Sequence, residues 1–78
     1  MKKWELNHAG NLVVVENRIN GEKLYVNEEL QDENLGLAIG RSRLWGKLKT
    51  GETIKVSLGG DFLMHCRIFI DDKLVLSK

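Results

Sequence analysis

The feature that most constrains the fold is an alternation of apolar and polar side chains with a period of two. It runs through residues 53–58 and again through residues 62–70, where Leu63 and Phe69 are apolar exceptions. The positions on its apolar side are Ile54, Val56, Leu58, Phe62, Met64, Cys66, Ile68 and Ile70. Because successive side chains of a β-strand point to opposite faces, this spacing predicts two strands that each turn one face into a core.

The connection between these two strands decides which of their side chains pair. A three-residue loop at residues 59–61 places Leu58 opposite Phe62 and keeps the apolar positions on one face. The same register sets Lys55 opposite His65 on the other face. A two-residue loop would divide the apolar faces, so we predict the three-residue loop.

The rest of the chain reads as further short strands separated by turns. It contains eight glycines and no proline, and the glycines fall between short apolar runs. Strands are predicted at residues 3–8, 12–19, 23–26, 35–39, 43–48 and 73–76, with a turn and a short edge strand at 27–34. Turns are predicted at Asn20-Gly21, at Thr50-Gly51 and, on weaker chemistry, at Asp71-Asp72.

These elements predict an all-β fold, a small antiparallel β-sandwich or flattened barrel of about seven to eight short strands. The chain has 78 residues, which is enough for a single domain. A domain of this size buries only about 60% of the surface that its unfolded chain exposes, so its core is thin. Self-association is one way for such a domain to gain stability.

Two segments of the chain read alike. Residues 24–30 and residues 68–74 both follow the order aliphatic, aromatic, aliphatic, acid or amide, acid, charged residue, leucine. The similarity has two explanations, an internal repeat or the shared demands of any strand–turn–strand segment. We favour the second, because hairpin chemistry alone imposes such an order.

Charge and cysteine content indicate the setting of the protein. The net charge is +1, so no global field would attract nucleic acid or an anionic membrane. Cys66 is the only cysteine, so no internal disulfide can form and a reducing cytoplasm is expected. Residues 1–8 lack the apolar stretch of a signal peptide, and the longest apolar run, 12–15, is too short to cross a bilayer.

Few residues carry the chemistry of catalysis or of metal binding. Cys66 lies on the apolar side of its strand, which predicts an inert core residue. His8 and His65 occur at no recognised metal-ligand spacing, and no serine lies in a nucleophile motif. We therefore expect no enzymatic activity, no metal and no cofactor. The acids within residues 28–33 are interpreted as a solvated edge that keeps an exposed strand from pairing with other chains.

The basic middle of the chain is the candidate binding surface. Residues 34–50 contain no acid. The candidate binding residues are Arg41, Arg43, Trp45, Lys47 and Lys49. In an extended strand they share one face, and a basic stripe around an indole can bind a protein partner, stack on a base or lie against a sugar ring. The interpretation we favour over either kind of binding is that Trp45 helps to seal the core while the cations are solvated, because small domains bury aromatic residues wherever they can.

The order of motifs also carries a resemblance to a known family. The motifs are Trp4, residues 12–16, Gly21 and residues 24–27, then, after the basic middle, residues 53–58, Phe62 and residues 67–74. Over nearly the whole chain this layout resembles one domain of the Fas apoptosis inhibitory molecule (FAIM) family, which has characteristic turns where this chain has residues 25–28 and 70–73. The resemblance implies a compact antiparallel β-sandwich with a protein-interaction role and no enzymatic activity.

The sequence therefore predicts a non-enzymatic protein-interaction or assembly module, for instance a homo-oligomer paired through exposed strand edges. The alternative is a small ligand-binding module for single-stranded nucleic acid or carbohydrate that uses the same face around Trp45. The low net charge disfavours strong binding of a polyanion. No membrane partner is expected.

Overall fold

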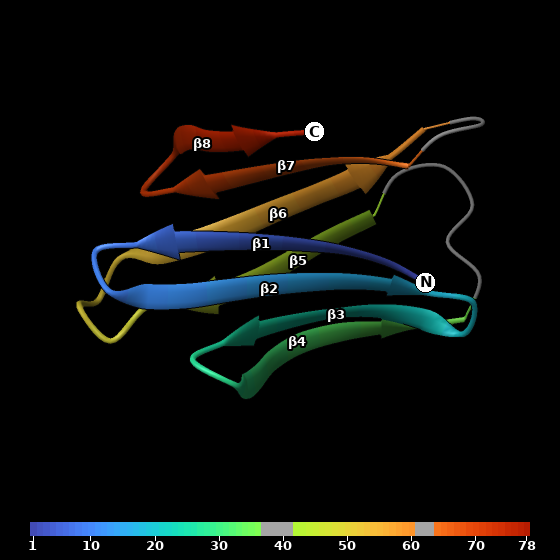
Figure 1. Ribbon diagram of the computed structural model, residues 1–78, viewed down its shortest axis with the longest axis horizontal. Helices are drawn as coiled ribbons and strands as arrows, with labels where there is room; N and C mark the ends of the chain where they lie inside the picture. The colour runs from blue at the N-terminus through green and yellow to red at the C-terminus, as the bar shows by residue number, and fades with distance from the viewer. Residues whose placement is uncertain (37–41, 61–63) are drawn as a thin grey trace.

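The computed structural model describes residues 1–36, 42–60 and 64–78, and these residues form eight β-strands and no helix. The strands are β1 (Lys2–His8), β2 (Asn11–Arg18), β3 (Gly21–Val26), β4 (Glu29–Leu35), β5 (Ser42–Lys47), β6 (Thr53–Gly59), β7 (His65–Ile70) and β8 (Lys73–Ser77) (Figure 1). They pair antiparallel in chain order to give a first sheet, β1–β4, and a second sheet, β5–β8. The predicted all-β sandwich is confirmed. The described part of the chain offers no helix that could span a bilayer.

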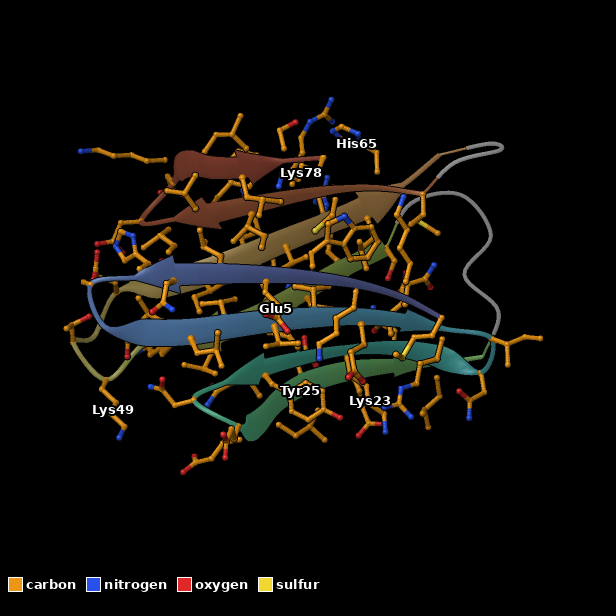
Figure 2. All side chains as sticks on the ribbon, in the orientation of Figure 1. Glu5, Lys23, Tyr25, Lys49, His65 and Lys78 are labelled. Atoms are coloured by element: carbon orange, nitrogen blue, oxygen red, sulfur yellow. The ribbon has the colours of Figure 1, made fainter. Side chains whose placement is uncertain are left out.

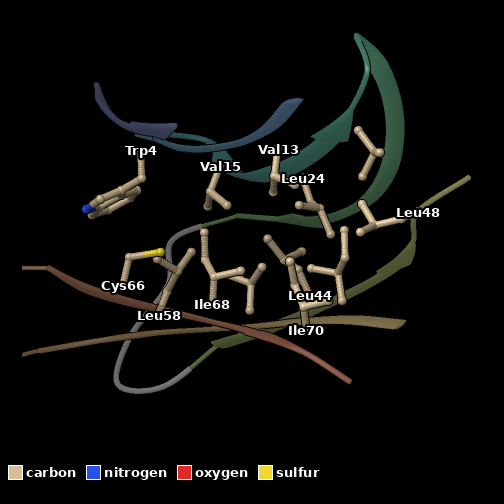
Figure 3. Packing of buried hydrophobic residues seen from close by; sticks show 13 residues of the cluster. Trp4, Val13, Val15, Leu24, Leu44, Leu48, Leu58, Cys66, Ile68 and Ile70 are labelled. Carbon is tan, nitrogen blue, oxygen red and sulfur yellow. The ribbon is translucent and has the colours of Figure 1, made fainter. Parts of the chain in front are cut away.

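The two sheets pack face to face around one apolar core (Figure 3). The residues of this core are Trp4, Val13, Val15, Leu24, Val26, Leu44, Leu48, Ile54, Val56, Leu58, Cys66, Ile68 and Ile70. Nearly all of them lie at alternate positions along the strands, so the period-two pattern of the sequence is the pattern of burial. Met64 is only partly buried at the margin of the core, and Phe62 lies outside the described residues.

The last hairpin of each sheet, β3–β4 in the first and β7–β8 in the second, has the same conformation, which explains the similarity of residues 24–30 to residues 68–74. Val26 pairs with Glu29 across a two-residue turn, and the register of β3 and β4 shifts at Leu24/Tyr25. The hairpin of β7 and β8 has the same turn length, and its register shifts at the corresponding position. Both residues of each turn have positive φ: Asn27, Glu28, Asp71 and Asp72. The two segments therefore have the same turn conformation and the same β-bulge.

The first residue of each turn also forms a hydrogen bond with the strand that comes before the hairpin, β2 in the first sheet and β6 in the second. The Oδ1 atom of Asn27 accepts a hydrogen bond from the amide of Leu12 at 2.9 Å. The Oδ1 atom of Asp71 accepts one from the amide of Thr53, also at 2.9 Å. These matched contacts define equivalent positions in the two sheets, so that Tyr25 corresponds to Phe69.

The predicted register between β6 and β7 is wrong. Leu58 pairs with Cys66 rather than with Phe62, and Lys55 pairs with Phe69 rather than with His65. The connection spans residues 60–64, of which 61–63 lie outside the described residues. The observed register differs from the predicted one by four residues. An even shift leaves the same side chains facing the core, so alternation alone could not distinguish the two registers.

The predicted turn at Asn20-Gly21 is displaced by one residue. Arg18 pairs with Gly21, so Ile19 and Asn20 form the connection and Gly21 begins β3. A Cβ atom on Gly21 would collide with the carbonyl oxygen of Asn34 in β4. The glycine is therefore required by a close approach between two backbones.

The strand predicted at residues 35–39 does not begin where it was predicted. Leu35 is the last residue of β4, Gly36 lies outside the strand, and residues 37–39 lie outside the described residues. The edge strand predicted within residues 27–34 is confirmed, since β4 is the last strand of the first sheet.

Candidate functional site

A row of large side chains crosses the outer face of the second sheet. Trp45 pairs with Lys55 on the neighbouring strand, Lys55 pairs with Phe69, and Phe69 pairs with Leu74. The ammonium of Lys55 lies 5.7 Å from the centre of the Trp45 ring and 5.2 Å from the centre of the Phe69 ring. Both distances are typical of cation–π contacts. The lysine therefore lies between two aromatic rings on the surface.

Trp45 is 55% exposed, so the favoured interpretation that it seals the core is wrong. Its neighbour Leu44 is fully buried, and because side chains alternate along β5 the indole must point outward. The indole that seals the core is that of Trp4, which is 5% exposed.

A second row on the same face carries two arginines that form no ion pair within the described residues. Arg43 pairs with Ser57, Ser57 with Arg67, and Arg67 with Ser77. Both arginines are exposed. Lys47 continues the outward side of β5 and pairs with Thr53. We call Arg43, Trp45, Lys47, Lys55, Arg67 and Phe69 the basic–aromatic face.

The five residues predicted from the sequence separate into three groups. Strand β5 carries Arg43, Trp45 and Lys47 at alternate positions of one face. Lys49 lies beyond the end of that strand, in the connection to β6 (Figure 2), so it does not continue the stripe. Arg41 lies outside the described residues.

Sequence reasoning missed the other half of the face. Lys55, Arg67 and Phe69 come from β6 and β7, and they lie beside Trp45 only because of the register between strands. The alternation did indicate that all three point away from the core. The incorrect β6–β7 register placed Lys55 opposite His65, so the pairing of Lys55 with Phe69 was not predicted.

The first sheet shows what the same surface looks like without excess charge. At the positions equivalent to the arginine–serine row, Lys3 pairs with Glu16, Glu16 with Lys23, and Lys23 with Glu33. Each cation there has a carboxylate on a neighbouring strand, whereas Arg43 and Arg67 have serines. The position equivalent to Trp45 is Glu5 (Figure 2). The fold therefore does not require the positive charge of the second sheet.

The acidic strand β4 lies beside this face and covers the backbone edge of β5. The Oδ2 atom of Asp32 accepts a hydrogen bond from the amide of Trp45 at 2.9 Å. The side-chain amide of Asn34 donates to the carbonyl oxygen of Arg43 at 3.0 Å. Side chains of β4, rather than another strand, thus provide hydrogen-bond partners for the backbone of β5 at Arg43 and Trp45.

The remaining reactive side chains are dispersed. Cys66 is fully buried, as predicted, and this burial raises the pKa of its thiol to about 12, although Lys2 acts in the opposite direction. The Nε2 atom of His65 lies 2.9 Å from the Ser77 hydroxyl, and the Nε2 atom of His8 lies 3.4 Å from a Glu52 carboxylate oxygen. Within residues 1–36, 42–60 and 64–78, no three metal-ligating side chains gather.

The basic–aromatic face is thus the surface whose composition the fold itself does not explain. No family model matches the sequence, and no curated protein or solved structure matches it. The resemblance to the FAIM family stays a prediction.

Proposed function

We propose that this chain is a non-enzymatic protein-interaction or assembly module that binds an acidic protein surface through the basic–aromatic face. The observation that carries this proposal is the exposed Trp45 in a cationic setting whose counterpart in the first sheet is neutralised. Tryptophan and arginine are the residues most enriched at the energetic centres of protein interfaces.

The contacts around Trp45 support a preorganised site. The backbone amide of Trp45 is held by Asp32, and the Lys55 ammonium lies against its ring. Side chains that are already ordered lose less conformational entropy when a partner binds. The exposed guanidinium groups of Arg43 and Arg67 can each donate two parallel hydrogen bonds to a carboxylate.

The proposal includes the cytoplasm as the location and excludes catalysis. A free thiol that is buried in the core, as Cys66 is, suits a reducing compartment. The protonated state of this thiol at neutral pH also leaves it a poor nucleophile.

Single-stranded nucleic acid or carbohydrate is the second candidate, and one observation favours it. Trp45 and Phe69 both lie on the outer face with Lys55 between them, and such rings can stack on bases or sugars. The balanced net charge of +1 supports the protein partner instead, because strong binders of nucleic acid are basic overall.

The experiment is a calorimetric titration of the protein with a polyglutamate peptide in low salt. We expect Trp45→Ala to weaken binding by about tenfold or more, as loss of an interface centre does. The matched control is Tyr25→Ala, which removes an aromatic ring from the outer face of the other sheet and should change the Kd less than about twofold. Equal effects of the two substitutions, or no binding by the wild-type protein, would overturn the proposal. Tighter binding of oligothymidylate than of the peptide would favour the second candidate.

A further inference from the structure

Building on the proposed function, we infer that the acidic partner is a second copy of this chain, whose β3–β4 hairpin docks on the basic–aromatic face. The docking element, called here the acidic hairpin, carries Glu28, Glu29 and Glu33.

Charge separation within the chain is the first argument. Residues 1–36 contain four basic and seven acidic side chains, whereas residues 37–78 contain eight basic and four acidic ones. The near-zero net charge therefore conceals two halves of opposite sign. Each copy presents both a cationic face and an anionic hairpin, so two copies are electrostatically complementary.

The acidic hairpin is available for such a contact. Its three glutamates are exposed, and none of them forms an ion pair within the described residues. Lys23 lies opposite Glu33, but residues 24–36 contain no lysine or arginine, so Glu28 and Glu29 have no cation across the hairpin. Leu30 on the same hairpin is 46% exposed and offers an apolar contact for the partially exposed rings of the opposite face.

The position of the hairpin prevents it from satisfying the basic face of its own molecule. Asp32 and Asn34 fix β4 against the edge of β5, on the side of the sandwich, by hydrogen bonds to the backbone. The glutamates are therefore held beside the basic–aromatic face and not over it. A contact between opposite charges must then form between molecules, with each copy using one surface for each neighbour.

Charge-reversal variants test this inference by sedimentation velocity. Glu29→Lys/Glu33→Lys removes the acidic hairpin, and Arg43→Glu/Arg67→Glu removes the charge of the basic face. All four positions are exposed, so the substitutions disturb no buried side chain. Circular dichroism checks that each variant keeps its β-structure.

We expect the wild-type protein to associate more as its concentration rises, and less in high salt because exposed charges are screened. Either double variant alone should weaken association by about tenfold or more. An equimolar mixture of the two should recover association, because each surface of one variant meets an opposite surface of the other. Lys73→Glu/Lys78→Glu makes the same change in net charge as the arginine variant but at positions outside the basic–aromatic face, and it should behave as the wild type.

Failure of this inference is distinguishable from failure of the proposed function. A wild-type protein that stays monomeric at millimolar concentration but binds polyglutamate through Trp45 would overturn the self-association and retain the binding face. Association that persists in both double variants would overturn the inference as well, since it would place the contact elsewhere.

Discussion

At the scale of single residues, the least expected side chain is Glu22. It is 1% exposed, and neither carboxylate oxygen has a hydrogen-bond partner within the described residues. Its position on β3 faces the core, in line with Leu24 and Val26, and the equivalent residue of the second sheet is Cys66. Alternation predicts that position 22 faces inward but gives no reason for a carboxylate there. Burial of a polar group without a partner costs stability.

Replacement of this carboxylate should therefore stabilise the fold. Glu22→Met keeps the side-chain volume and removes the unpaired oxygens, so we expect the free energy of unfolding to rise by about 1–3 kcal/mol in urea denaturation. The control Glu33→Met lies at an exposed position of the neighbouring strand and should change it by less than about 0.5 kcal/mol. A loss of stability in Glu22→Met would contradict the interpretation of this carboxylate as buried at a cost to the fold.

At the scale of elements, strands were easier to predict than the way they pair. The burial pattern of β6 and β7 follows from alternation, because it depends on neighbouring residues only. The pairing of Leu58 with Cys66 depends on the length of the loop between the two strands. Registers that differ by an even number of residues leave the same side chains facing the core, so alternation does not distinguish them. The turn at Asp71-Asp72 was a weak signal because neither residue favours positive φ, yet both adopt it.

The two shared hairpin turns store conformational strain at their second position. Asp72 has a φ of 66°, a conformation that costs an L-residue roughly 1–2 kcal/mol and costs glycine almost nothing. Allowing for the greater freedom of glycine in the unfolded chain, Asp72→Gly should raise the free energy of unfolding by about 0.5–1 kcal/mol. Thermal denaturation measures this. The control is Lys73→Gly, one residue later and in β8, which should lower the free energy of unfolding by a similar amount. A stabilising effect of Lys73→Gly, or a destabilising effect of Asp72→Gly, would contradict the assignment of strain to Asp72.

At the scale of the whole molecule, the candidate site is only partly visible in the sequence. Arg43, Trp45 and Lys47 could be grouped from their spacing along one strand. Lys55 and Arg67 join them through pairings between strands, which are non-local and cannot be read from a single segment. The exposure of Trp45 also depended on the whole fold, because a second indole, that of Trp4, was available to fill the core.

The comparison of the two sheets identifies the basic–aromatic face as the candidate site. Both have the same final hairpin and the same order of strands, but their outer faces differ in charge. The positive charge of the second sheet is not required by the fold, and a binding site is expected to have such a surface. Opposite charge on the two halves is what supports our inference that the partner is a second copy.

The most direct test of this account is selective quenching of Trp45 fluorescence. Subtracting the spectrum of Trp45→Phe from that of the wild-type protein isolates the emission of this indole, while the variant reports the buried Trp4. We predict that the isolated emission resembles that of tryptophan in water, and that the ratio of iodide to caesium quenching exceeds the ratio for free tryptophan, since an exposed ring among cations attracts the anion. Blue-shifted emission that neither ion quenches would place Trp45 in the interior and contradict the basic–aromatic face.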